Sequence, residues 1–214
     1  MDEMALTFEK THPDVTIQTS YAGSKVIAAQ IQQGAAVDLV LISETVVNDL
    51  GGALTDLTPI DKNHTAIVIS IAAAAKIHSA ADLVKPGVRL GSGTPGSVIG
   101  RTGAQTVEKI AKRLGGDYAA KFAANVTTTK TDNAKLSAAV EAGAVDAAIL
   151  YSSDAVAGKT VAIELPESDR MYEKHDAAIA KASAHQAAAR AYLTLLTSAD
   201  GAAIFLRHHH EPVR

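Results

Sequence analysis

The sequence predicts an α/β fold built mainly on parallel strands. Short segments rich in apolar and β-branched residues alternate along the chain with segments whose apolar residues recur at helical spacing. Residues 65–72 are apolar almost throughout, which is typical of a strand buried on both faces. Alternating strands and helices indicate βαβ units, in which parallel strands lie side by side. The 214 residues suffice for one large domain or two small lobes.

The elements follow in order from these patterns. The first is an amphipathic helix over residues 1–10, since Met1, Met4 and Phe8 share one face. The helices expected after it cover residues 24–33, 44–50, 79–84, 98–114, 117–124, 132–142, 184–197 and 200–207. The expected strands cover residues 15–20, 37–42, 65–72, 88–91, 125–129, 147–150, 161–165 and 175–180.

The composition excludes several classes of protein. The net charge of −3 leaves no excess of Lys and Arg to neutralise phosphates, which argues against a nucleic-acid partner. No apolar run approaches the roughly 20 residues that span a bilayer, so no membrane insertion is expected. Cysteine is absent, which excludes disulfides and thiol catalysis. The first residues show no signal-peptide pattern.

Four strand ends or helix starts offer polar groups, from side chains or from the backbone. Ser24 opens the helix after the first strand, and Val98 opens the helix after the glycine-rich loop. Asn133 opens a third helix, behind the capping candidates Thr131 and Asp132, and Tyr151 ends an apolar strand. Such residues often serve only as helix caps, and we expect Ser24 to be one. The alternative is an anion site, because free backbone N–H groups and the positive end of the helix dipole converge there.

A glycine-rich loop at residues 91–96 offers a different function. Gly91, Gly93 and Gly96 match the dinucleotide fingerprint G-x-G-x-x-G between a strand and a helix. The match is weak, because no strand ending in Asp or Glu follows about 20 residues later. Catalytic signals are poor as well, since the serines lack a nucleophile elbow and no P-loop is present. We expect no enzyme, no cofactor and no metal site, and we interpret His208, His209 and His210 as a solvated tail.

Two blocks of sequence resemble a known family. The letters YAGS at residues 21–24 and AQIQQGAAVD at residues 29–38 are similar to the motif S-x-x-L-x-x-Q-I-x-x-G-A-x-x-D. The letters VEAGAVDAAILYSSDA at residues 140–155 are similar to V-E-x-G-x-A-D-x-G-I-V-Y-x-[ST]-D-A. Both motifs belong to the molybdate-binding (ModA-type) periplasmic proteins of ABC importers, which have the type II solute-binding fold.

The resemblance implies a two-lobed protein that closes on a tetrahedral oxyanion. Lobe one would comprise residues 1–70 and 156–214, and lobe two residues 71–155. Carried over by position, Ser24 would give its hydroxyl and amide, Val98 and Asn133 their amides, and Tyr151 its hydroxyl. The ligand would be molybdate or tungstate, the partner an ABC permease, and the location periplasmic. The family begins with a strand and an A-A-S-L turn, and this chain is expected to lack that first strand.

Two alternatives stay open beside this interpretation. One is an α/β enzyme that binds a nucleotide or phosphate ester at residues 91–96. The other is a cytoplasmic oxyanion sensor domain with the same fold. Molybdate, tungstate and other oxyanions are not distinguished by the sequence.

Overall fold

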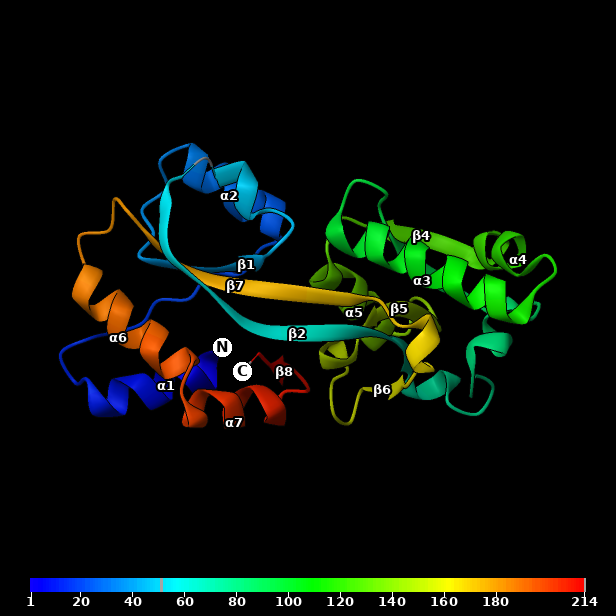
Figure 1. Ribbon diagram of the computed structural model, residues 1–214. Coiled ribbons are helices and arrows are strands. Elements are labelled where there is room, and N and C mark those ends of the chain that lie inside the picture. The colour runs from blue at the N-terminus through cyan, green and yellow to red at the C-terminus, as the bar shows by residue number, and fades with distance from the viewer. Residues whose placement is uncertain (51, 214) are drawn as a thin grey trace. The chain divides into compact units, whose positions relative to one another are not determined.

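A computed structural model describes residues 1–50 and 52–213 (Figure 1). The chain forms two compact units. The first unit combines Met1–Lys62 with Glu173–Arg214, and the second is Asn63–Tyr172. Strands and helices alternate through most of both units, so the predicted α/β class is confirmed.

The sheet of the first unit has antiparallel neighbours. Strand β1 (Leu39–Ser43) pairs with β7 (Tyr172–Ala180), and the short β8 (Glu211–Pro212) pairs with β2 (Leu54–Ser70). The helices are α1 (Asp2–Thr11), α2 (Ser24–Gln32), α6 (Gln186–Leu196) and α7 (Ala199–Arg207). In Figure 1, α2 lies on the opposite side of β1 and β7 from the other three helices.

The core of the first unit lies between the sheet and the helices α1, α6 and α7. Met4 and Phe8 of α1 are fully buried, as the amphipathic pattern at the start of the chain predicts. The ring of Phe8 meets that of Tyr192 of α6 edge to face, with 5.1 Å between centroids. These contacts join a helix from the start of the chain and a helix from near its end in one hydrophobic cluster.

The second unit combines parallel and antiparallel strands in the order β2-β5-β3-β4, with β6 also paired to β2. The strands are β3 (Leu90–Gly93), β4 (Val126–Lys130), β5 (Ala147–Tyr151) and β6 (Thr160–Ile163). The helices are α3 (Val98–Leu114), α4 (Tyr118–Asn125) and α5 (Asn133–Glu141). Short 3₁₀ turns complete the chain: η1 (Val47–Leu50), η2 (Ile71–Ala73), η3 (Ala80–Val84), η4 (Ser152–Asp154) and η5 (Glu167–Asp169).

The prediction of a strand at residues 15–20 is wrong, because this segment runs as irregular backbone. Val15 and Ile17 are half-buried against the core of the first unit, so their apolar side chains still find partners. The backbone N–H of Ile17 donates to the Glu9 carboxylate at 2.7 Å rather than to a neighbouring strand. The alternating apolar pattern at residues 15–20 therefore indicates burial and not strand pairing.

The predicted predominance of parallel strands is also wrong. Parallel pairing holds for β3 with β4 and for β3 with β5. The pairs of β2 with β5, β6 and β8, and of β7 with β1, are antiparallel. The chain passes from one unit to the other within β2 and returns within β7. Alternation of strands and helices does not encode the direction of such connecting strands.

The boundaries of the two units differ from the boundaries predicted for the lobes. The units divide after residues 62 and 172, where the prediction placed the divisions after residues 70 and 155. Residues 63–70 fall in the second unit because the later half of β2 pairs with β5 and β6. Residues 156–172 fall there for the same reason, since they include β6.

Asp146 joins three strand ends in the second unit. Its carboxylate accepts hydrogen bonds from the Arg89 backbone and guanidinium, both at 2.9 Å, and pairs with Lys76 at 3.1 Å. Its backbone carbonyl accepts from the N–H of Ser70. Burial alone would raise the pKa of Asp146, but the hydrogen bonds from Arg89 and Lys76 outweigh it and lower the pKa to about 2.

Candidate anion-binding site

Three of the four predicted ligand residues lie at one edge of the second unit's sheet. Because β3 runs parallel to β4 and β5, the carboxyl ends of these three strands meet at the same edge. Val98 begins α3 after β3, and Asn133 begins α5 after β4. Tyr151 is the last residue of β5. The fold therefore gathers three positions that are far apart in the sequence.

Hydrogen bonds through Thr102 and Asp154 connect these three residues. The Tyr151 hydroxyl lies 3.5 Å from the hydroxyl of Thr102, which donates to the Val98 carbonyl at 2.9 Å. On the other side, the Asn133 side-chain amide donates to Asp154 at 2.9 Å. The second oxygen of Asp154 accepts the backbone N–H of Tyr151 at 3.0 Å. The network connects Tyr151 to the starts of α3 and α5.

Thr102 and Asp154 were not predicted as parts of the site. Thr102 stands four residues after Val98, and hence one helical turn above it on the same face of α3. Asp154 stands three residues after Tyr151, which is the spacing of a capping interaction. Both spacings are visible in the sequence, but only the pairing of β3 with β5 brings the two groups to one place.

Each of the two helix starts has a side-chain cap. The cap accepts from the third helical residue and not from the first. Ser97 caps α3 by accepting from the N–H of Gly100 at 3.0 Å. Asp132, one of the two capping candidates predicted from the sequence, caps α5 by accepting from the N–H of Lys135 at 2.9 Å. In both helices the capped donor is the third helical residue. Val98 and Asn133 are the first helical residues, and the amide N–H of a first helical residue has no acceptor within its own helix.

Close packing requires one glycine of the glycine-rich loop, Gly93, and one glycine of α3, Gly100. A Cβ atom on Gly93 would lie 2.4 Å from the backbone nitrogen of Gly100, and a Cβ on Gly100 would lie 1.8 Å from the Thr94 carbonyl oxygen. No side chain fits at either distance, so the glycines allow the end of β3 to touch the start of α3. This packing accounts for Gly93 of the fingerprint pattern, whereas a Cβ on Gly96 would meet nothing within 4 Å.

The fourth predicted residue, Ser24, lies in the first unit. The N-cap position of α2 is Gly23, so the prediction that Ser24 caps this helix is wrong. Ser24 is instead the first helical residue, and its hydroxyl oxygen accepts the backbone N–H of Ser43 at 3.2 Å. A hydroxyl at the first helical position stands at the helix start, where the proposed hydroxyl and amide of Ser24 come from the same residue.

Ser24 belongs to a polar group that the sequence analysis did not assemble. The hydroxyl of Ser43 lies 2.8 Å from that of Thr45 and donates to the carboxylate of Glu173. Ser43 and Glu173 are buried, with 1% and 4% of their surface exposed. The position of Ser43 at the end of a predicted strand was the available signal, whereas Glu173 comes from β7 and joins only through the fold.

Among residues 1–50 and 52–213, no helix combines the length and apolar character needed to cross a membrane.

The chain belongs to a family of binding proteins. Residues 1–211 match the model of the bacterial extracellular solute-binding protein family, and the chain is a member of that family. Members of this class bind a solute and are not enzymes. The periplasmic-binding fold expected from the sequence is thereby confirmed for nearly the whole chain.

The chain is also similar to individual proteins, among them molybdate-binding proteins. The chain is 27% identical over 200 residues to the molybdate-binding protein ModA of Mycobacterium tuberculosis, covering 91% of this chain and 73% of the relative. It is 27% identical over 215 residues to the putative ABC transporter substrate-binding lipoprotein YvgL of Bacillus subtilis, covering 97% and 80%. Its fold is similar to that of the Azotobacter vinelandii periplasmic molybdate-binding protein, with a TM-score of 0.76, 17% identity, and coverage of 100% and 94%.

Proposed function

We propose that this chain captures molybdate outside the cytoplasm and delivers it to the permease of an ABC importer. The observation that carries the proposal is the network that joins Val98, Asn133 and Tyr151 at one sheet edge. Membership in the solute-binding family and the names of the molybdate-binding relatives support it.

The proposed ligand residues are neutral hydrogen-bond donors. In the second unit these are the amides of Val98 and Asn133 and the hydroxyl of Tyr151, and in the first unit the hydroxyl and amide of Ser24. Helix starts attract anions through their free N–H groups and the positive end of the helix dipole. A set of amides and hydroxyls that all donate to the ligand matches an oxyanion that carries no proton, because every ligand oxygen then accepts. Molybdate and tungstate both meet this condition, and the proposal covers both.

Delivery to a permease implies a place outside the cytoplasm. The M. tuberculosis and B. subtilis relatives are described as a molybdate-binding protein and a substrate-binding lipoprotein. Fractionation of cells that produce the native gene product tests the location. We expect the protein in the periplasm or attached to the outer face of the cytoplasmic membrane. Recovery in the cytoplasm would favour the sensor-domain alternative.

A thermal-shift assay separates the proposal from the enzyme alternative. A ligand that binds only the folded state stabilises it by about 2.7 kcal/mol when present at 100 times its dissociation constant. We expect sodium molybdate to raise the melting temperature, and ATP or NAD to leave it unchanged. A rise with ATP or NAD and none with molybdate would contradict the proposal and support a nucleotide site at residues 91–96.

A further inference from the structure

A second group of polar side chains lies in the first unit, on residues that the oxyanion proposal does not use. It consists of Asp61 on β2, His175 on β7, and His210 in the segment between α7 and β8. We propose that Asp61, His175 and His210 form a binding site for a divalent transition metal ion, with zinc as the best match.

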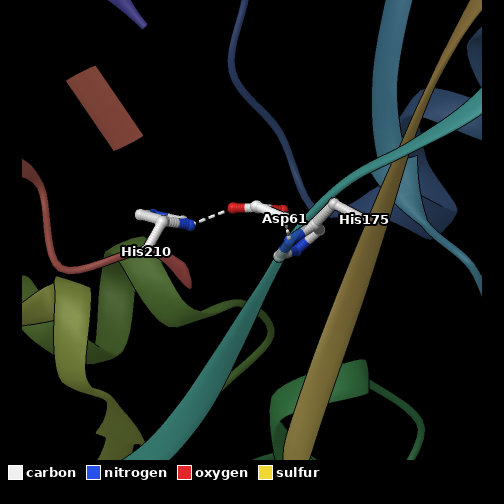
Figure 2. A group of neighbouring side chains, drawn as sticks. All are labelled: Asp61, His175 and His210. Atoms are coloured by element: carbon white, nitrogen blue, oxygen red, sulfur yellow. Dashed lines mark hydrogen bonds and ion pairs between the residues drawn. The ribbon is translucent and has the colours of Figure 1, made fainter. Parts of the chain in front are cut away.

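Figure 2 shows the carboxylate of Asp61 between the two imidazole rings. One of its oxygens lies 2.8 Å from Nδ1 of His175, and the other contacts Nδ1 of His210. The three candidate ligand atoms lie within 4.8 Å of one another. Zinc binds imidazole nitrogen and carboxylate oxygen at about 2.0–2.2 Å, so its ligand atoms stand about 3.3 Å apart in tetrahedral geometry. Small side-chain rotations therefore suffice to surround an ion.

The donor set has the chemistry of a zinc site. Imidazole nitrogen suits zinc, copper and nickel, and a carboxylate beside it supplies negative charge. Asp61 is 2% exposed, so its charge is buried and must be compensated. The side chains of His175 and His210 remain 26% and 25% exposed. Water can therefore reach the ion from the imidazole side and supply a fourth ligand.

The proton balance of binding is simple. In the metal-free form both Nδ1 atoms donate to the Asp61 carboxylate, which accepts only. On binding, each neutral imidazole moves its proton to Nε2 and offers the Nδ1 lone pair to the ion. A protonated imidazole releases one proton instead, so zinc affinity falls as the pH is lowered.

The neighbouring histidines separate a built site from an exposed cluster. The prediction of a solvated tail holds for His208 and His209, which are exposed, but is wrong for His210, which is half-buried. The ring of His210 lies 6.1 Å from that of Phe205, centroid to centroid. His208 contacts Glu3 at 2.9 Å instead of Asp61. The chain thus offers matched histidines inside and outside the proposed site.

Calorimetric titration with zinc chloride tests the site on protein that has been treated with a chelator and dialysed. We expect one zinc ion per wild-type chain and a higher melting temperature with zinc. His210→Ala and His175→Ala each remove a ligand and should weaken zinc binding by at least about tenfold. Loss of a group that only hydrogen-bonds to a metal ligand already costs about tenfold to a hundredfold in metal affinity. His208→Ala and His209→Ala should bind zinc like the wild type.

Two results would overturn the inference. Absence of saturable binding at one equivalent would mean that the three groups form a hydrogen-bonded anchor only. Equal weakening by His208→Ala or His209→Ala would mean adventitious binding to exposed histidines. Melting curves without metal check that each variant folds. If His175→Ala on β7 does not fold, His210→Ala decides the question, and molybdate titration of that variant without zinc should give the wild-type affinity.

Discussion

Tyr151 illustrates how one residue connects a strand to the proposed site. Its side chain is 6% exposed, and its hydroxyl lies beside Thr102 at the start of α3. The phenol therefore packs as a core residue while its polar end stands at the sheet edge where the helix starts gather. Removing the hydroxyl alone should separate these two roles.

Tyr151→Phe should weaken molybdate binding by about tenfold to a hundredfold, because a hydrogen bond to a charged partner contributes roughly 1.5–3 kcal/mol. The melting temperature without ligand should change little, since phenylalanine keeps the buried aromatic ring. Calorimetry and melting curves provide both values.

Tyr118→Phe is the matched control for Tyr151→Phe. The Tyr118 hydroxyl donates to the Ala80 carbonyl at 2.8 Å within the core of the second unit. This control should lower stability by about 1 kcal/mol and leave molybdate affinity intact. If Tyr151→Phe behaves like Tyr118→Phe, the role assigned to Tyr151 is refuted.

Ser24→Ala should also weaken molybdate binding by about tenfold to a hundredfold. Its structural cost should be small, because Gly23 occupies the N-cap position and Ser24 only accepts the Ser43 N–H at 3.2 Å. The control is Ser198→Ala, since Ser198 caps α7 by accepting from Gly201 at 3.1 Å. That control should cost about 1 kcal/mol of stability with binding unchanged. Unchanged molybdate affinity in Ser24→Ala would contradict the proposal and show that this hydroxyl has only a structural role.

At the scale of elements, the contact between β3 and α3 depends on glycine. Gly100→Ala places a Cβ 1.8 Å from the Thr94 carbonyl oxygen, and this backbone atom cannot rotate away. Overpacking of this kind should destabilise the protein by about 1–3 kcal/mol or more. Gly103→Ala in the same helix is the control, because its Cβ would meet Ile149 only at 4.0 Å. It should be neutral or stabilise by roughly 0.5–1 kcal/mol. Equal urea midpoints for the two variants would contradict the packing account.

The joint between β2, β3 and β5 should be sensitive to pH through Asp146. Its pKa is about 2 in the folded protein and about 3.9 when unfolded. The ionised carboxylate therefore stabilises the fold above pH 4, and this contribution is lost as the pH falls toward 2. Asp146→Asn should cost about 1–2 kcal/mol at neutral pH, a value reduced because Arg89 and Lys76 are half exposed.

Urea unfolding of the wild type and Asp146→Asn between pH 7 and 2 measures this contribution. The difference in unfolding free energy should shrink from about pH 4 downward. The control is Asp117→Asn, whose pair with Lys121 is exposed and should matter little. A difference that stays constant over the whole range would show that the carboxylate's charge is not what stabilises the joint.

How far the sequence predicts these elements depends on what each pattern encodes. The helix at residues 98–114 was predicted with its observed bounds, because Ser97 caps it and Gly115 ends it with a positive φ of 73°. The strand at residues 15–20 failed, because apolar residues there bury without a strand partner. Asp61 and Glu173 escaped prediction, because each meets its partners only through contacts between distant segments.

At the scale of the whole molecule, the chain crosses between its two units twice, within β2 and within β7. Each unit contributes its own donors to the proposal: Ser24 in the first, and the connected group of Val98, Asn133 and Tyr151 in the second. The two-lobed division was predicted from the family resemblance, and the absence of a linker indicated that the chain crosses over and returns. Predicting its boundaries required knowing that β2 begins at Leu54 and that its later half pairs with β5 and β6.

The central claim is that these neutral donors select a fully ionised tetrahedral oxyanion. Phosphate at neutral pH carries a proton, which meets no carboxylate or carbonyl acceptor among the proposed ligand groups, and an unsatisfied buried group costs about 1–3 kcal/mol. Calorimetric titration of the wild-type chain with molybdate, tungstate, sulfate and phosphate tests the claim most directly. The account predicts saturable binding of molybdate and tungstate at one site per chain, with phosphate weaker by about fivefold to a hundredfold. Phosphate affinity equal to that for molybdate, or no heat with molybdate at all, would contradict it.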